Sequence, residues 1–156
     1  MVIGDHVSHE DKKTLVRAQL TPWTVLYFYC HFPRHHPRPS NNKYLLIASA
    51  LEANLIALYI SSHIAPLVAI TPARLQCQVT LPHGSCGFLS LESYLDCSDF
   101  LRLDTEYAVE KLVDEMWRIK GQIVEPAIRT ATVKAVGSAT TLPQFVQQRI
   151  LQALHA

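Results

Sequence analysis

Glycine is scarce in this sequence, and the few glycines form none of the patterns that hold a nucleotide. Only five of the 156 residues are glycine. Walker-type and dinucleotide-binding motifs need glycines at fixed spacing, because the backbone must approach phosphate groups closely. Their absence argues against an NTPase and against a dinucleotide-dependent dehydrogenase.

Charged residues are also few, and no apolar segment is long enough to cross a membrane. Charged residues make up 17% of the chain and hydrophobic residues 49%, a balance that excludes intrinsic disorder. The net charge of +1 is too small for the whole surface to attract nucleic acid. The most apolar window, residues 44–60, is interrupted by Glu52 and Asn54 and falls short of the ~20 residues that a spanning helix needs. Because residues 1–6 lead into charge rather than into a signal-peptide core, we predict a cytoplasmic protein that has no membrane partner.

Cysteine pairs and the common catalytic motifs are missing as well. The four cysteines lie far apart, without a CxxC pair or zinc-ligand spacing: Cys30, Cys77, Cys86 and Cys97. We expect reduced, partly buried thiols, no metal and no cofactor. Asp96 and Asp99 favour a turn or a helix cap over a metal site. Neither a GxSxG motif nor a recognisable Cys–His pair supports nucleophilic catalysis by the protein.

The part of the chain up to about residue 100 carries strand patterns after one short helix. Ser8 is placed to cap that helix, which lies within the first 20 residues. Apolar and polar residues alternate from Leu75 to Leu81, which predicts a half-buried strand. Other strands are expected over residues 24–32, 43–48 and 55–61 and within 87–96. The continuous apolar runs at 43–48 and 55–61 predict strands buried on both faces.

The remaining residues show helical periodicity. Five apolar residues recur with the spacing of one helical face: Val109, Leu112, Val113, Met116 and Trp117. This predicts a helix that Asp104 caps and Gly121 ends. A second helix is expected over residues 126–136, and a third begins at Thr141 with Gln144 as its capping-box partner.

The order of these elements predicts the fold class. Strands come first and helices follow, without the alternation of a doubly wound fold. We therefore expect an α+β protein that forms a single domain over residues 1–156. Its small antiparallel sheet or barrel spans about residues 22–100, and its helical part spans about residues 104–156.

The loop from His31 to Pro39 has the most unusual composition in the chain. It combines two arginines with three histidines: Arg34, Arg38, His31, His35 and His36. Guanidinium groups pair bidentately with phosphate and histidine transfers protons near neutral pH, so this loop is typical of a phosphate or RNA contact. There are two alternatives: the loop is a metal site, or it is a solvated polar loop that has no function. Residues 1–45 hold six Lys and Arg against three Asp and Glu, so the basic character is N-terminal.

Four short motifs follow one another in a set order. They are Arg38 with Pro39 before an apolar strand that ends at Ser49, a second strand that ends in Ser61 and Ser62, the run Ser93-Tyr94-Leu95-Asp96-Cys97, and Lys120 with Gly121. Together, over about residues 22–136, they resemble the MazF/PemK-like toxins of bacterial toxin–antitoxin systems. The resemblance is closer to the uncharacterised bacterial and phage proteins that are related to those toxins.

The resemblance implies a fold, an activity and a site. It implies a small antiparallel SH3-like β-barrel that forms a homodimer, has an antitoxin as protein partner and cleaves single-stranded RNA without a metal ion. It places Arg38 and either Ser61 or Ser62 at the cleavage site. In this hypothesis of a toxin-like endoribonuclease, a hydrolase, Arg38 stabilises the phosphate, Ser61 or Ser62 orients it, and His35 or His36 is the acid or base. Arg34 and His31 would add RNA contacts.

A second hypothesis is an SH3-like module that binds a protein partner and catalyses nothing. The high apolar content and two tryptophans favour a surface that an oligomer or a partner covers. A ribonuclease predicts that Arg38 and the two serines reach one phosphate, whereas a binding module predicts an exposed Arg38 and an apolar patch elsewhere. A DNA-binding regulator is disfavoured, because the face with Glu110, Asp114 and Glu115 is acidic.

Overall fold

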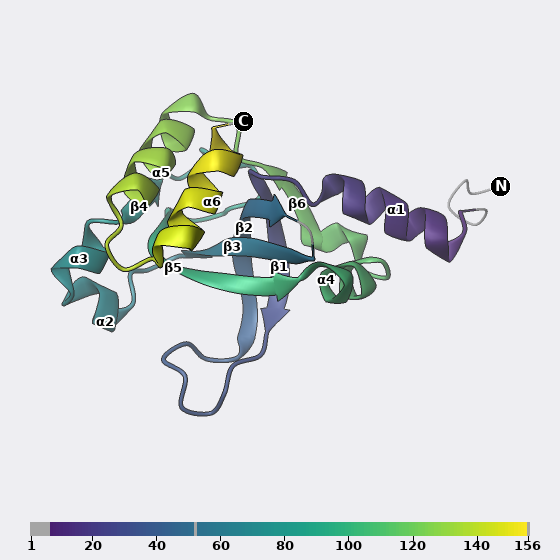
Figure 1. Cartoon of the computed structure of the whole chain (residues 1–156), viewed down its shortest axis with the longest axis horizontal. Helices are drawn as coiled ribbons and strands as arrows, with labels where there is room; N and C mark the ends of the chain where they lie inside the picture. Colours follow the sequence, from purple (N-terminus) through teal and green to yellow (C-terminus); the bar gives the residue numbers. More distant parts are fainter. Residues whose placement is uncertain (1–6, 52, 156) are drawn as a thin grey trace.

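A six-stranded antiparallel sheet with helices on both of its faces forms the body of the protein (Figure 1). The structure is a computed structural model, and it describes residues 7–51 and 53–155. Residues 1–6, on which the expectation about targeting depends, and Glu52 lie outside the described residues. The α+β class, the antiparallel barrel-like sheet and the C-terminal helices are all confirmed.

The strands pair in the order β4-β5-β3-β2-β1-β6, and every neighbouring pair is antiparallel. Their bounds are β1 (Thr24–Cys30), β2 (Asn41–Leu51), β3 (Asn54–Ser61), β4 (Gln78–Leu81), β5 (Ser93–Asp104) and β6 (Ile119–Gln122). The register shifts in three of these pairs, as at β-bulges. Bulges bend strands and increase their twist, which accounts for the curled, barrel-like sheet.

Helices cover both faces of the sheet (Figure 1). Their bounds are α1 (His9–Gln19), α2 (Pro66–Ala69), α3 (Pro72–Leu75), α4 (Thr105–Leu112), the 3₁₀ helix η2 (Met116–Arg118), α5 (Pro126–Ser138) and α6 (Gln144–Leu154). The Ser8 hydroxyl accepts a hydrogen bond from the Asp11 N–H (3.1 Å), and Asp104 accepts one from the Tyr107 N–H (2.8 Å). Both predicted N-caps are therefore confirmed.

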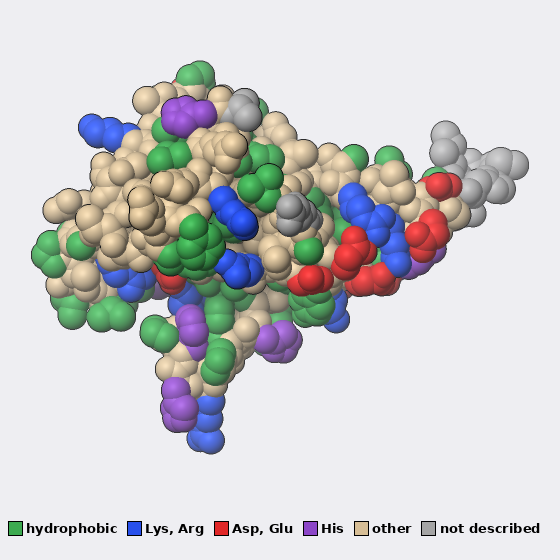
Figure 2. Space-filling view, in the orientation of Figure 1, with side chains coloured by type: hydrophobic (Ala, Val, Ile, Leu, Met, Phe, Trp, Pro, Cys, Tyr) green, Lys and Arg blue, Asp and Glu red, His purple; other side chains and the backbone are tan. Residues whose placement is uncertain are grey.

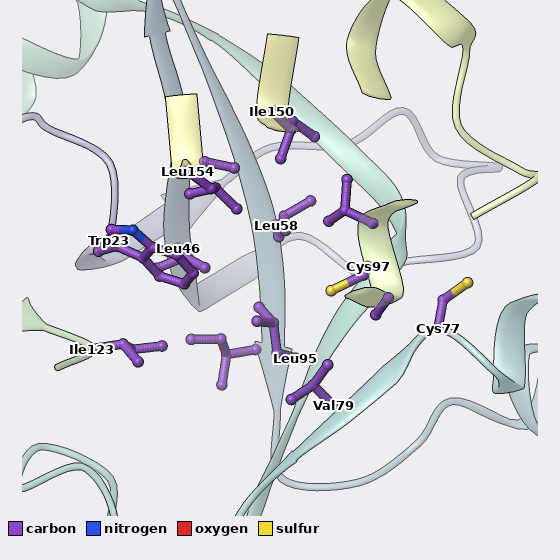
Figure 3. Close-up of a cluster of buried hydrophobic side chains, with 14 of the residues drawn as sticks. Trp23, Leu46, Leu58, Cys77, Val79, Leu95, Cys97, Ile123, Ile150 and Leu154 are labelled. Atoms are coloured by element: carbon purple, nitrogen blue, oxygen red, sulfur yellow. The ribbon is translucent and has the colours of Figure 1, made fainter. Parts of the chain in front are cut away.

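Alternate residues of the central strands enter two separate cores. Leu46 and Leu58 pack with Ile150 of α6 on one face, where Figure 3 shows them. Leu45 and Ala57 belong to the opposite core; its other members include Val16 of α1 and Val109 of α4. Because both faces are covered, β2 and β3 need apolar side chains at consecutive positions. The prediction that these strands are buried on both faces is confirmed.

Two strand predictions had the wrong bounds. The strand expected from Leu75 begins only at Gln78, because Pro72 starts the short helix α3, which ends at Leu75. Cys77, Val79 and Leu81 are buried as expected, whereas Leu75 is exposed. The strand expected within residues 87–96 begins at Ser93 and continues to Asp104, since its second half pairs with the start of β3.

The predicted helix over residues 105–117 was too long. It ends at Leu112, and Trp117 lies in the separate turn η2, with 56% of its surface exposed. Gly121 ends no helix: it lies in β6 opposite Val25, with a φ of +135° that side chains rarely adopt. Pairing at the free edge of β1 overrides the helical periodicity here. The sheet thus takes its sixth strand from the part expected to be helical.

The two C-terminal helices differ from the prediction at their ends. Helix α5 continues through Gly137 to Ser138. Thr141 is not the cap of α6, whose N-cap is Pro143; the Thr141 hydroxyl instead donates to the Ser98 carbonyl oxygen (2.6 Å). Helix α6 buries Val146, Ile150 and Leu154 against the sheet.

Candidate functional site

The loop between β1 and β2 projects from the sheet as an arm (Figure 1). We call residues 31–40 the arm. Basic and histidine side chains gather at its tip (Figure 2), and Arg34 and His35 are exposed there. Pro33, Pro37 and Pro39 keep the arm out of the sheet ladder, because proline lacks the N–H that the ladder needs.

Arg38 ties the base of the arm to the sheet. Its Nη2 donates to Asp96 Oδ2 (2.7 Å) and its Nε donates to Asp99 Oδ2 (3.4 Å). The guanidinium lies 3.7 Å from the centroid of the Tyr59 ring, an arrangement that adds a cation–π contact. Only 14% of the Arg38 side chain is exposed. The side chain is therefore neither free in solvent nor unpaired.

Asp96 is the centre of this network. Its Oδ1 accepts from the Ser98 N–H (2.9 Å), the Ser98 hydroxyl (2.5 Å) and Gln78 Nε2 (2.8 Å). Its Oδ2 faces Arg38 and also lies 3.5 Å from Arg74 Nη2. Burial by itself raises the pKa of Asp96, but these hydrogen bonds and the Arg38 charge outweigh burial and lower the pKa. The carboxylate therefore stays ionised inside the protein.

Both aspartates thus pair with arginines and neither caps a helix, while Asp96 also accepts the N–H of Ser98, two residues on, as in an Asx turn. Asp99 also pairs with Arg74, at 3.9 Å. Among the described residues, no three His, Cys, Asp or Glu side chains gather in a group that would hold a metal ion. Sequence reasoning missed this network because its acids and its two arginines are far apart in the chain.

A cleft of about 460 Å³ lies beside the base of the arm. We call it the Ser61 cleft. It brings together Arg38, Ser61 and Ser62, the three residues that the resemblance placed at one site. Its other lining residues come from the arm, from β1, β2 and β3, from the segment after β3 and from the start of β5 with the residues before it: Tyr27, Pro37, Pro39, Asn41, Asn42, Lys43, Tyr44, Ile60, His63, Ala65, Leu89, Ser90, Leu91 and Ser93.

The other four predicted residues do not line the Ser61 cleft. Arg34 and His35 are exposed on the arm. His31 contacts the Tyr29 ring (4.6 Å between centroids) and lines a different hollow, beside α4. His36 stacks on Phe32 (4.3 Å), and its Nδ1 accepts from the Arg38 N–H (3.0 Å), so it shapes the arm from within.

Two residues of the cleft escaped the sequence analysis as site residues. His63 follows Ser62, with 3.5 Å between its Nδ1 and the serine Oγ. Lys43 brings a positive charge, and burial together with the Arg38 charge lowers its pKa. The strand that ends in two serines would have pointed to His63, because the next residue lies at the same edge of the sheet.

The cysteines take no part in the site. All four are buried and unpaired, which confirms the expectation of buried thiols. Burial raises the pKa of Cys30 to about 11 and also raises the pKa of Cys77, Cys86 and Cys97. None is therefore a ready thiolate at neutral pH.

No protein-family model matches the chain, and the comparison with curated proteins gives no match either. Of the helices that the described residues form, none is both long and apolar enough to cross a membrane. The geometry of the Ser61 cleft is therefore the observation from which a function is inferred.

Proposed function

We propose that the protein binds single-stranded RNA in the Ser61 cleft and cleaves it by a metal-independent reaction, as a toxin-like endoribonuclease. The observation that carries this proposal is the meeting of Arg38, Ser61 and Ser62 in one cleft. These residues come from two separate elements, and their sequence context resembles that of the MazF/PemK-like toxins. An SH3-like barrel and a homodimer belong to the same proposal.

The proposed reaction needs only the RNA and groups of the protein. The 2′-hydroxyl of one nucleotide attacks the adjacent phosphorus, a P–O bond to the next 5′-oxygen breaks, and a 2′,3′-cyclic phosphate forms. A base takes the proton of the 2′-hydroxyl and an acid gives one to the leaving 5′-oxygen. Stabilisation of the negative charge on the phosphate oxygens supplies the remaining rate enhancement.

The cleft offers a group for each of these tasks. The hydroxyls of Ser61 and Ser62 donate hydrogen bonds to a phosphate oxygen, and the Lys43 ammonium balances its charge. His63 is the imidazole that lines the cleft, so we assign it the role first proposed for His35 or His36. It takes the proton of the 2′-hydroxyl and then, as the imidazolium that this forms, gives the proton to the leaving 5′-oxygen. These assignments are part of the proposal.

Arg38 has two tasks in this proposal. Its Nε and Nη2 hold the base of the arm through Asp99 and Asp96. Its remaining nitrogen, Nη1, is the donor that the proposal assigns to a phosphate oxygen. A guanidinium fixed by two carboxylates is preorganised, so little reorganisation accompanies the reaction.

RNA cleavage in EDTA is the test. We expect the wild type to cut a long single-stranded RNA at discrete sites and to leave 2′,3′-cyclic phosphate ends. The double variant Ser61→Ala, Ser62→Ala and the variant His63→Ala should each cut about 100-fold more slowly, the usual loss for a missing donor or acid–base group.

Two controls accompany this assay. Ser138→Ala changes an exposed serine at the end of α5 and should cut like the wild type. Arg38→Ala should also lose cleavage, but it disturbs the arm as well, so the serine and His63 variants carry the conclusion. Intact RNA after incubation with folded wild type would contradict the proposal.

The second candidate is a non-catalytic module that binds a protein partner. Arg38 is not exposed as this hypothesis predicted, since only 14% of its side chain is accessible. One observation still favours the module: Asp96, Asp99 and Tyr59 engage the Arg38 guanidinium, so a structural role alone accounts for its contacts. Exposed apolar side chains on α2 and α3 would then supply the contact surface. This candidate predicts that RNA stays intact and that a charge at Ile70 abolishes partner binding.

A further inference from the structure

Four aromatic rings lie in a row across the strands next to the Ser61 cleft. We call Trp117, Tyr27, Tyr44 and Phe88 the aromatic row. The centroids of Trp117 and Tyr27 are 6.2 Å apart, those of Tyr27 and Tyr44 are 4.8 Å apart, and those of Tyr44 and Phe88 are 6.4 Å apart. The antiparallel register places Tyr27 directly opposite Tyr44, which brings β1 and β2 aromatics together.

The aromatic row is accessible and continuous with the cleft. Trp117 is 56% exposed, which is unusual for the largest apolar side chain. Tyr27, Tyr44 and Phe88 are partly exposed, and Tyr27 and Tyr44 also line the Ser61 cleft. A ligand in the cleft therefore meets the row without any rearrangement of the chain.

Cations flank the row at its Trp117 end. Arg118 lies 4.6 Å from the Trp117 ring and Lys120 lies 4.9 Å from it. Arg118 is held by Glu115 and by the side chain of Asn42, whereas Lys120 forms no ion pair with another described residue. Lys120 is thus a half-buried positive charge beside the rings that no carboxylate of the described residues pairs with.

We propose that the aromatic row is the base-binding subsite of the Ser61 cleft, on which unpaired bases of single-stranded RNA stack. Aromatic rings interleaved with cations are the common way to bind single-stranded nucleic acid, because every base has a π-face and every nucleotide a phosphate. Bases in a duplex are already stacked on one another, so the row selects single strands. The choice of RNA rests on the proposed function; the stacking itself does not.

The row also explains how a bound RNA strand would be oriented relative to the cleft. Bases on Trp117 and Tyr27 leave their backbone facing Lys120, whose ammonium lies 4.9 Å from the Trp117 ring and 5.8 Å from the Tyr27 ring. The strand then continues past Tyr44 into the cleft, where Ser61 and Ser62 lie. The subsite therefore positions the phosphate that follows the stacked bases.

The fluorescence of Trp117 serves as the probe of binding in the test. The other of the two tryptophans, Trp23, is buried in the core and serves as an internal reference. We would titrate the wild type with oligo(U) that carries 2′-O-methyl groups, which binds but cannot be cleaved because the attacking hydroxyl is blocked. Stacking should quench the fluorescence of Trp117 until the oligonucleotide saturates the protein. A titration with double-stranded RNA should leave the fluorescence unchanged.

Variants then test the row directly by the affinity for labelled oligo(U). Trp117→Ala and Tyr27→Leu should each weaken binding about tenfold, as the loss of one stacked base does. Trp117→Phe keeps a ring and should restore most of the affinity. Phe145→Ala is the matched control: Phe145 is an exposed aromatic beside Arg102 and Arg149, but it lies on α6 outside the row, and binding should not change.

The outcomes separate this inference from the proposed function. Row-dependent binding without cleavage would support the row and contradict the ribonuclease. Cleavage in EDTA with unchanged affinity in Trp117→Ala would overturn the row and leave the ribonuclease standing. Equal binding of a single-stranded DNA oligonucleotide supports the row, since its bases stack equally well. Failure of every oligonucleotide to bind, or equal quenching by the duplex, overturns it and favours a protein ligand.

Discussion

A single buried carboxylate, Asp96, determines how the site is held together at the scale of residues. It accepts hydrogen bonds from Ser98 and Gln78 on one oxygen and faces Arg38 and Arg74 with the other. A buried charge is costly unless every lone pair is used, and here each one has a donor. Asp96 therefore stabilises the fold only while it is ionised.

This dependence predicts acid sensitivity. Because the pKa of Asp96 in the folded protein lies below its ordinary value of 3.8, its stabilisation is complete above about pH 4 and is lost as the pH falls further. Asp96→Asn puts an amide N–H against Arg38, and we expect it to lower the free energy of unfolding by about 3 kcal/mol at pH 7. Urea denaturation between pH 7 and pH 3 measures both effects.

The decline of stability below pH 4 should be shallower in Asp96→Asn than in the wild type. Asp114→Asn is the control, since Asp114 is exposed and has no ion pair within the described part of the chain. It should keep the stability and the pH dependence of the wild type. If the stability of Asp96→Asn declined below pH 4 as steeply as that of the wild type, other carboxylates would be responsible for the acid sensitivity.

At the scale of elements, the arm behaves as a separate unit that is attached through Arg38. Its prolines exclude it from the sheet, and its internal contacts are the His36–Phe32 stack and the bonds of Ser40 to Phe32. The contacts of Arg38 with Asp96 and Tyr59 link it to β5 and β3. The arm borders the Ser61 cleft, so its attachment also shapes the cleft.

Loss of Arg38 should release the arm. Trypsin can cut after Arg34 but not after Arg38, because Pro39 follows. We expect Arg38→Ala to speed cleavage after Arg34 about tenfold, the factor that ~1.4 kcal/mol of lost local restraint gives. Limited proteolysis followed by mass spectrometry measures this. Arg149→Ala removes a helical arginine far from the arm in sequence and should leave that cleavage rate unchanged; an unchanged rate in Arg38→Ala would show that the arm holds itself.

At the scale of the whole molecule, an apolar surface and a small net charge favour association. Exposed apolar side chains gather at α2 and α3, at the lower left of Figure 2: Leu67, Ile70 and Leu75. Ile70 is 77% exposed. With a net charge of only +1, little electrostatic repulsion keeps two copies apart.

We therefore predict a homodimer through this surface. Sedimentation velocity should give a dimer for the wild type and a monomer for Ile70→Asp, because a buried carboxylate without a partner is costly. Val124→Asp places the same charge on an equally exposed apolar residue beside β6 and should remain a dimer. A monomeric wild type, or a dimeric Ile70→Asp, would rule out this surface as the dimer interface.

Features that depend on neighbouring residues could be predicted from the amino-acid sequence alone. Ser8 and Asp104 cap helices because a short side-chain oxygen reaches an N–H three residues later. The apolar runs of β2 and β3 predicted strands covered on both faces, since a strand with one wet face would alternate. The α+β class follows from these local patterns.

Features that join distant parts of the chain could not be predicted in this way, because they depend on how the strands pair. Residues 119–122 follow a run with helical periodicity but pair with β1, because a sheet edge offers hydrogen bonds that an exposed helix turn does not match. Arg38 and its partner Asp96 lie 58 positions apart in the chain, so no local pattern contains the pair. The Ser61 cleft and the aromatic row exist for the same reason: strand register, rather than sequence spacing, sets which side chains become neighbours.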